Sequence, residues 1–150
     1  MSEAATAREI TITRVFDAPR ELVWQAWTDP EHLARWWGPP GRSTPAESIT
    51  VELRPGGTFR LSSIDDERGD DMVTLGTFRE VVEPERLVVE EAAEDSWHEG
   101  AVSEITLSEL DDGRTEMRFR ATIHTTDEMI GMAEAGITAS FDRLGELVAR

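Results

Sequence analysis

The sequence has no cysteine, lysine, asparagine or tyrosine, and these absences narrow its chemistry. Without cysteine, disulfides, thiolate metal sites and cysteine nucleophiles are excluded. Long apolar runs are also missing, whereas a membrane-spanning helix needs about 18 consecutive apolar residues. The N-terminal stretch MSEAATARE lacks the apolar core of a secretory signal. These features predict a cytoplasmic protein that does not insert into membranes.

Carboxylates dominate the charge of the chain. There are 31 Asp and Glu residues against 15 basic residues, all of them arginine, and the formal net charge is −16. Such a surface repels phosphate backbones and anionic lipid heads, so we do not expect nucleic acid as a partner. The lysine-free composition has two readings that stay open: codon bias in a GC-rich genome, and adaptation to salt or heat.

Four of the five tryptophans lie between Ile10 and Pro40. Alternating β-branched residues from Glu9 to Phe16 predict a strand at the start of this stretch. Two short helices, over 19–28 and 30–37, are expected to follow, because each begins with a proline, which fits the first turn of a helix. We expect residues 1–8 to form a loose tail and residues 9–150 to form one domain.

The middle of the chain predicts antiparallel strands. Their expected ranges are Ser48–Arg54, Thr58–Ile64, Met72–Val82, Arg86–Ala93, Val102–Leu110 and Thr115–Ile123. An Asp-Gly turn at residues 112–113 joins two alternating runs, which is typical of a hairpin. In the last strand the apolar residues share one face and the arginines share the other, so the sheet has one apolar face and one wet face.

The C-terminal part predicts a long amphipathic helix over residues 126–149. Thr125 and Glu128 fit a capping box at its start. Its apolar stripe consists of Ile130, Ala133, Ile137, Phe141, Leu144 and Val148. Helices gathered on one face of an antiparallel sheet define an α+β domain. We expect about six to seven curved strands wrapped around this long helix.

Several motifs together resemble the START-like (SRPBCC) superfamily, and within it the branch named after the activator of the Hsp90 ATPase. The matching pieces are Arg14-x-Phe-Asp-Ala-Pro19, Val23-Trp-x-Ala-Trp-Thr-Asp-Pro-Glu31, Trp36-Trp-Gly-Pro39, Leu53-Arg-Pro-Gly-Gly57, Gly76-Thr-Phe-Arg-Glu-Val81 and Pro84-Glu-Arg-Leu87. The resemblance implies a helix-grip fold with a cavity between the sheet and the C-terminal helix. In the superfamily such cavities hold lipids, hormones, polyketides or antibiotics, and some members are cyclases or hydrolases.

The residues that would line this cavity follow from the strand and helix patterns. Small residues on the helix leave volume, methionines adapt to a ligand, and aromatic rings give an apolar wall. The expected ligand-binding residues are Trp36, Trp37, Phe59, Leu61, Met72, Trp97, Met117, Phe119, Met132, Gly136 and Ser140. For each of them, plain packing in the core is the competing interpretation.

Two further features bear on catalysis. Glu90 and Glu91 are consecutive in a predicted strand, so they point to opposite faces and one of them would face the cavity. A carboxylate there, with His98 nearby, could act as a general acid or base. The alternative is that both carboxylates are solvated. No nucleophile motif occurs, and the three histidines are not spaced as metal ligands, so we expect no metal and no cofactor.

Three functions remain open. The first is a module that binds a hydrophobic small molecule, and we expect it over the others. The second is a small cyclase-type or hydrolase-type enzyme that uses the same cavity. The third is a protein-interaction module related to chaperone control, with an Hsp90-type chaperone as its partner, and a homodimer is compatible with any of the three.

Overall fold

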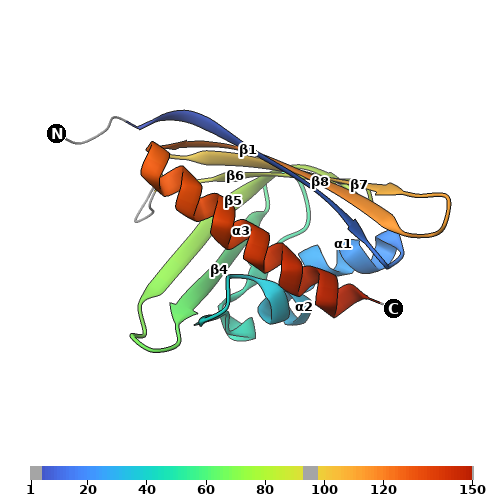
Figure 1. Ribbon diagram of the computed structural model, residues 1–150, viewed down its shortest axis with the longest axis horizontal. Helices are drawn as coiled ribbons and strands as arrows, with labels where there is room; N and C mark the ends of the chain where they lie inside the picture. Colours follow the sequence, from blue (N-terminus) through green and yellow to red (C-terminus); the bar gives the residue numbers. More distant parts are fainter. Residues whose placement is uncertain (1–4, 93–97, 150) are drawn as a thin grey trace.

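The computed structural model describes residues 5–92 and 98–149, which form an α+β helix-grip fold (Figure 1). Its strands are β1 (Thr6–Phe16), β2 (Arg42–Ser43), β3 (Thr50–Val51), β4 (Thr58–Asp65), β5 (Asp71–Val82), β6 (Arg86–Glu91), β7 (Ala101–Glu109) and β8 (Thr115–Thr125). Its helices are α1 (Arg20–Thr28), α2 (Pro30–Trp36), the short 3₁₀ helix η1 (Ala46–Ser48) and α3 (Asp127–Val148). No helix among these residues is long and apolar enough to cross a membrane.

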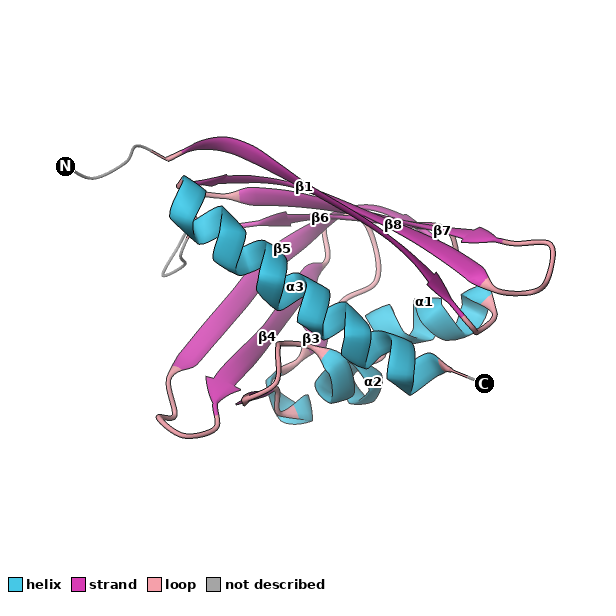
Figure 2. Ribbon diagram, viewed as in Figure 1, coloured by secondary structure: helices cyan, strands magenta, loops and turns pink. Residues whose placement is uncertain are grey.

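The strands form one eight-stranded antiparallel sheet, curved around α3. Its order is β1-β8-β7-β6-β5-β4-β2, and β3 pairs with Phe59 and Arg60 near the start of β4. In Figure 2 the β4–β5 arm bends away from the layer of β6, β7, β8 and β1, and α3 lies across the concave side. A register shift between Phe78 and Glu80 on β5 lies where this arm meets β6. Such irregularities bend a strand and increase its twist.

Side-chain alternation gives the sheet its two faces. On β8, Met117, Phe119, Ala121 and Ile123 are buried toward the helix, as the alternating pattern predicts. The convex face carries a series of ion pairs across neighbouring strands. These pairs, with their N–O distances, are Glu9–Arg120 (3.0 Å), Arg86–Glu104 (2.7 Å) and Arg86–Glu80 (3.2 Å). Hydrogen bonds from Arg86 to Glu104 and Glu80 raise the pKa of the Arg86 guanidinium.

The two short helices begin as predicted. Pro19 precedes α1, and Pro30 is the first residue of α2. The Asp29 side chain accepts a hydrogen bond of 2.9 Å from the backbone N–H of Glu31, which caps α2. The helices pack at the C-terminal end of α3 and close that end of the fold (Figure 1).

The structure corrects three details of the sequence interpretation. The residue that caps α3 is Thr126, whose hydroxyl accepts from the N–H of Met129, while Thr125 is the buried last residue of β8. The expected strand over 48–54 is a 3₁₀ turn followed by the two-residue strand β3. The first strand begins at Thr6, inside the stretch expected to be a tail, because it pairs with β8 as far as Thr125.

Candidate ligand cavity

A cavity of about 400 Å³ lies between the concave face of the sheet and α3. It exists because α3 packs unevenly along its length. The buried residues of the helix, Ser140, Phe141, Leu144 and Val148, all lie in its C-terminal half. In the N-terminal half, Ala133 and Gly136 face the cavity, and a Cβ built on Gly136 would have no other atom within 4 Å. Small side chains on this half therefore leave the space between helix and sheet unfilled.

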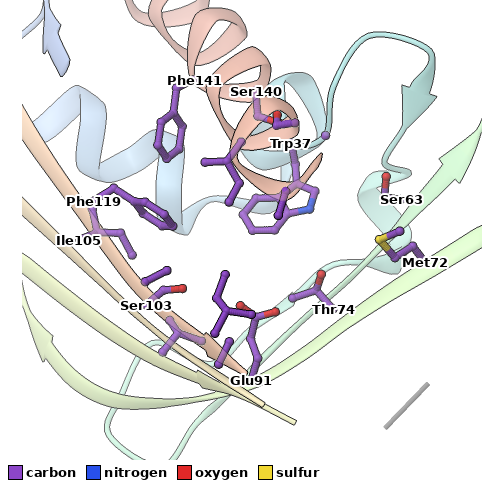
Figure 3. A pocket seen from close by; sticks show the side chains of 18 of the residues that line it. Trp37, Ser63, Met72, Thr74, Glu91, Ser103, Ile105, Phe119, Ser140 and Phe141 are labelled. Atoms are coloured by element: carbon purple, nitrogen blue, oxygen red, sulfur yellow. The ribbon is translucent and has the colours of Figure 1, made fainter. Parts of the chain in front are cut away.

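Aromatic rings form the wall of the cavity nearest the short helices. Trp37 packs edge-on against Phe59 of β4, with ring centroids 5.7 Å apart, and Phe119 of β8 packs against Phe141 of α3 at 5.2 Å. Figure 3 shows Trp37, Phe119 and Phe141 surrounding one end of the space. Edge-to-face pairs of this kind are favourable, and they hold the rings in place. This end of the cavity suits a flat or apolar molecule.

The adjacent tryptophans have different roles in this wall. Trp36 is 1% exposed, and its indole Nε1 donates a 2.8 Å hydrogen bond to the carbonyl of Ala26, so it ties α2 to the end of α1. Trp37 is only half-buried, and its ring reaches toward the middle of the cavity (Figure 3). Of the two, Trp37 has the surface that a ligand could cover.

Methionines lie at the edge of the cavity. Met72 on β5 is 42% exposed and Met132 on α3 is 63% exposed, and both line the cavity. Flexible thioether side chains can move and repack around different apolar molecules. The space between the β4–β5 arm and the N-terminal half of α3 is therefore the side from which a ligand could enter.

A carboxylate faces this mainly apolar space. Glu91 is the last residue of β6, and Figure 3 shows its side chain pointing into the cavity. Glu90 points to the other side of the sheet, where it pairs with Arg79. His98 also lines the cavity; its side chain is 3% exposed, and its Nε2 lies 3.7 Å from Glu91 Oε1. Of the two alternatives for these glutamates, one inward carboxylate or two solvated ones, the structure supports the first, with Glu91 at the cavity.

A second polar group lies near the β4–β5 arm. The Arg42 guanidinium donates to the hydroxyl and the carbonyl of Ser63, at 2.8 and 2.6 Å, and to the carbonyl of Asp70 at 3.0 Å. Arg42 NH1 also lies 3.8 Å from the carboxylate of Asp65. These contacts use the guanidinium to connect β2 with the hairpin, so Arg42 acts here as a structural brace beside the cavity.

Two carboxylates away from the cavity have lowered pKa values. Backbone N–H groups of Arg68 and Glu67 lower the pKa of Asp65 in the β4–β5 hairpin. The backbone N–H of Thr58 likewise lowers the pKa of Glu52. Among the described residues, no group of three or more His, Asp or Glu side chains is arranged to hold a metal ion.

Eight of the eleven residues expected at the cavity line it. They are Trp36, Trp37, Phe59, Met72, Phe119, Met132, Gly136 and Ser140. Leu61 and Met117 lie on the inner face of their strands but are completely buried and do not line the cavity. Trp97 lies outside the described residues. That any of these residues binds a ligand stays a prediction.

Sequence reasoning missed several lining residues. They include Trp27, Arg42, Ser63, Thr74, Phe78, Leu87, Val89, Ser103 and Ile105. Strand parity offered a signal for some of them, because Ser63 shares its face with Phe59, and Thr74 shares its face with Met72. Polar Ser and Thr at such positions look like solvent-facing residues in a sequence, which hid them.

The curved sheet, the long helix and the cavity between them define a helix-grip protein. The family model for Activator of Hsp90 ATPase homolog 1-like protein matches residues 17–149, and the chain belongs to this family. No curated protein matches the sequence.

Solved structures of proteins from several bacteria show the same fold. The chain is similar to protein CV1439 from Chromobacterium violaceum, with 25% identity, a TM-score of 0.83, and coverage of 95% of this chain and 98% of that one. It is also similar to CalU16 from Micromonospora echinospora, with 28% identity, a TM-score of 0.69, and coverage of 95% and 76%. Protein NE0264 from Nitrosomonas europaea has 25% identity, a TM-score of 0.75, and coverage of 93% of both chains.

Proposed function

We propose that this protein binds one hydrophobic small molecule in the cavity between the sheet and α3. The observation that carries the proposal is an apolar space of about 400 Å³ with a few polar groups on its wall. Ligand pockets in proteins commonly measure about 300–1,000 Å³ and combine an apolar lining with a small number of placed polar groups. A lipid, an aromatic polyketide or an antibiotic-like molecule has the matching chemistry.

The first test is a titration with N-phenyl-1-naphthylamine, a neutral apolar probe whose fluorescence rises when it leaves water. We expect saturable binding of one molecule per chain. Two alanines on α3 provide a matched pair of variants, because Ala133 lines the cavity and Ala135 is exposed on the outer face of the helix. Ala133→Phe should reduce the affinity at least severalfold by filling the cavity, and Ala135→Phe should leave it unchanged. Equal effects of the two substitutions would refute binding in the cavity.

A small enzyme that uses the same cavity is the second candidate, and the inward position of Glu91 beside His98 favours it. A carboxylate and an imidazole at this distance could move a proton to or from a bound substrate. The test is product analysis by mass spectrometry after incubation of ligands found in a binding screen with the wild type and with Glu91→Gln. Turnover that is unchanged by Glu91→Gln would contradict this role.

The chaperone-related function ranks below both. This function requires an apolar surface patch that could contact a partner protein, whereas the aromatic rings of the described residues either line the cavity or are buried in the core. A binding measurement with an Hsp90-type ATPase tests it directly. Stimulation of that ATPase would restore this candidate.

A further inference from the structure

Glu91 is a carboxylate that a ligand in this cavity would cover. Its neighbour Glu90 faces the other side of the sheet, where it pairs with Arg79. In the described part of the chain the ion-pair partner of Glu91 is an imidazole, and its side chain keeps 23% of its surface exposed. Covering a charge without a partner costs free energy. A ligand that displaces water from Glu91 therefore binds best if it brings its own partner for this charge.

His98 lies beside Glu91 but does not neutralise it. The Nδ1 atom of His98 accepts a 3.0 Å hydrogen bond from the backbone N–H of Gly100. A ring nitrogen that accepts a hydrogen bond carries no proton, and an imidazole with a single ring proton is uncharged. The Glu91–His98 pair, with its N–O distance of 3.7 Å, therefore keeps the negative charge of the carboxylate.

The other charged side chain on the wall is already compensated. Among the described residues that line the cavity, Arg42 is the arginine, and it donates hydrogen bonds to the carbonyls of Ser63 and Asp70 and lies 3.8 Å from the carboxylate of Asp65. The chain contains no lysine, and its net charge is −16. A protein with this charge attracts cations and repels anions. The wall at Glu91 and the field of the whole chain thus favour a ligand of the same sign, a cation.

Hydroxyl groups flank Glu91 on the inner face of the sheet. The register pairs Glu91 with Gly76 on β5 and with Ala101 on β7, and Thr74 and Ser103 lie two residues from these partners. Residues two apart in a strand share a face. Figure 3 shows Thr74 and Ser103 on either side of Glu91. An ammonium group has three N–H donors and no acceptor, so the carboxylate can accept one N–H and a neighbouring hydroxyl oxygen another.

Aromatic rings line the same space and suit the rest of such a ligand. Glu91 points from the sheet toward the side on which the half-buried ring of Trp37 lies (Figure 3). The face of a tryptophan attracts a cation within about 6 Å of the ring centroid. Phe119 and Phe141 offer apolar surface next to it. A carboxylate and an aromatic wall in one cavity form a combination that recognises organic cations.

Other ligand classes satisfy this wall less well. A fatty acid or another anionic molecule would place a second negative charge next to Glu91, and like charges repel. A hydrocarbon would remove water from the carboxylate without replacing its interactions. A neutral alcohol could donate one hydrogen bond but would leave the charge uncompensated. An ammonium group supplies both the hydrogen bond and the opposite charge.

We propose that the ligand of this cavity is an apolar molecule with a protonated primary amine, and that Glu91 binds its ammonium group. The apolar body is expected against Trp37, Phe119 and Phe141 (Figure 3). This inference rests on the proposed function, since it names the ligand class of the same cavity. It disfavours fatty acids and other anionic lipids as ligands.

The experiment compares three naphthalene probes of nearly equal size that differ in one group. Calorimetric or fluorescence titrations measure the affinity for 2-naphthylmethylamine, which is protonated at neutral pH, for 2-naphthalenemethanol, and for 2-ethylnaphthalene. Burial of apolar surface alone favours 2-ethylnaphthalene. A hydrogen bond between two charged groups reverses this order, and we expect the amine to bind about tenfold or more tightly than the alcohol.

Two adjacent glutamates supply the matched variants. Glu91→Gln and Glu90→Gln each remove one negative charge and keep the size of the side chain, so they change the overall field of the protein equally. Glu91→Gln should bring the ratio of affinities for the amine and the alcohol close to one. Glu90→Gln, on the opposite face of the same strand, should preserve the ratio.

A second measurement needs no variant and applies even if Glu91→Gln does not fold. The wild type is titrated with the amine and the alcohol in dilute and in concentrated salt. Salt screens the attraction between exposed charges, but it screens a contact pair inside a cavity much less. The preference for the amine should therefore persist in concentrated salt.

The outcomes separate this inference from the proposed function. Binding of N-phenyl-1-naphthylamine without any preference for the amine over the alcohol overturns the ammonium site and leaves a general apolar cavity. An equal loss of the preference in the two glutamine variants, or its disappearance in concentrated salt, also overturns it, because general attraction to an acidic protein would then be sufficient. Failure of every probe to bind overturns both proposals together.

Discussion

Gly136→Leu is expected to stabilise the protein and to weaken ligand binding at the same time. Gly136 lies on the face of α3 that lines the cavity, and no atom stands within 4 Å of a Cβ built there. A leucine at this position can therefore enter the cavity without a clash. Gly131 on the same helix is exposed, also has open space around a Cβ, and lies on the outer face. Gly131→Leu is the matched control.

The magnitude follows from two contributions. Replacing glycine by leucine in a helix raises its stability by about 0.8 kcal/mol, and this applies to both positions. Burying a leucine side chain contributes about 1.5–3 kcal/mol when burial is complete, so partial burial in the cavity adds about 1 kcal/mol at Gly136. We expect about 2 kcal/mol for Gly136→Leu and less than about 1 kcal/mol for Gly131→Leu.

The assay combines thermal unfolding with probe titration. For a domain of this size, 1 kcal/mol corresponds to about 2–4 °C in Tm, so the two variants should differ by several degrees. The affinity for N-phenyl-1-naphthylamine should fall at least severalfold in Gly136→Leu and stay at the wild-type value in Gly131→Leu. Equal Tm values for the two variants, or full binding by Gly136→Leu, would refute the position of the cavity.

Three further predictions concern the structure around the cavity. Trp36→Phe removes the buried hydrogen bond from Nε1 to the carbonyl of Ala26, so the free energy of unfolding in urea should fall by about 1–3 kcal/mol, and an unchanged value would show that the bond contributes nothing. Thr126→Ala removes the side chain that caps α3, so the free energy of unfolding should fall by about 1 kcal/mol in the same assay. If Thr125 were the cap, as the sequence predicted, loss of the cap would instead be seen in Thr125→Ala. Backbone N–H groups hold the pKa of Asp65 below its ordinary value in the folded state, so its contribution is present above the ordinary pKa of an aspartate and is lost as pH falls through the lowered value. The urea midpoint of Asp65→Asn should therefore lie below that of the wild type near pH 7, and this difference should shrink as the pH falls below the ordinary pKa of an aspartate. A difference that is independent of pH would contradict this.

The sequence predicted the elements that depend on local chemistry. Proline at the start of the two short helices, the apolar stripe of α3 and the alternation of β8 are all set by backbone geometry and side-chain spacing. The first residue of a helix was harder to predict where two adjacent residues could both serve as its N-cap. Thr125 and Thr126 are both suitable caps, and pairing of Thr125 with Thr6 in the sheet decides between them.

The candidate site could be predicted only in part. The alternation of side chains along a strand predicts that Glu90 and Glu91 face opposite sides of the sheet. It does not say which of them faces the cavity, because Leu87, Val88 and Val89 are all apolar and neither face of the strand is marked as polar. A sequence also does not show whether an inward-facing side chain reaches the cavity or is covered by its neighbours. Leu61 shares the inner face of β4 with Phe59, yet the packing around it leaves it no surface on the cavity. Such details depend on how far the helix stands from the sheet at each point.

The tryptophan indole signals provide the most direct test of where a ligand binds. Trp27, Trp36 and Trp37 line the cavity, whereas Trp24 is buried and does not line it. In ¹H–¹⁵N spectra, addition of N-phenyl-1-naphthylamine or 2-naphthylmethylamine should shift the indole N–H signal of Trp37 most and that of Trp24 least. Backbone signals of Ala133 and Gly136 should move with Trp37. Shifts confined to Gly131, Ala135 and the outer face of α3, or no shift at saturating probe, would contradict a ligand between helix and sheet.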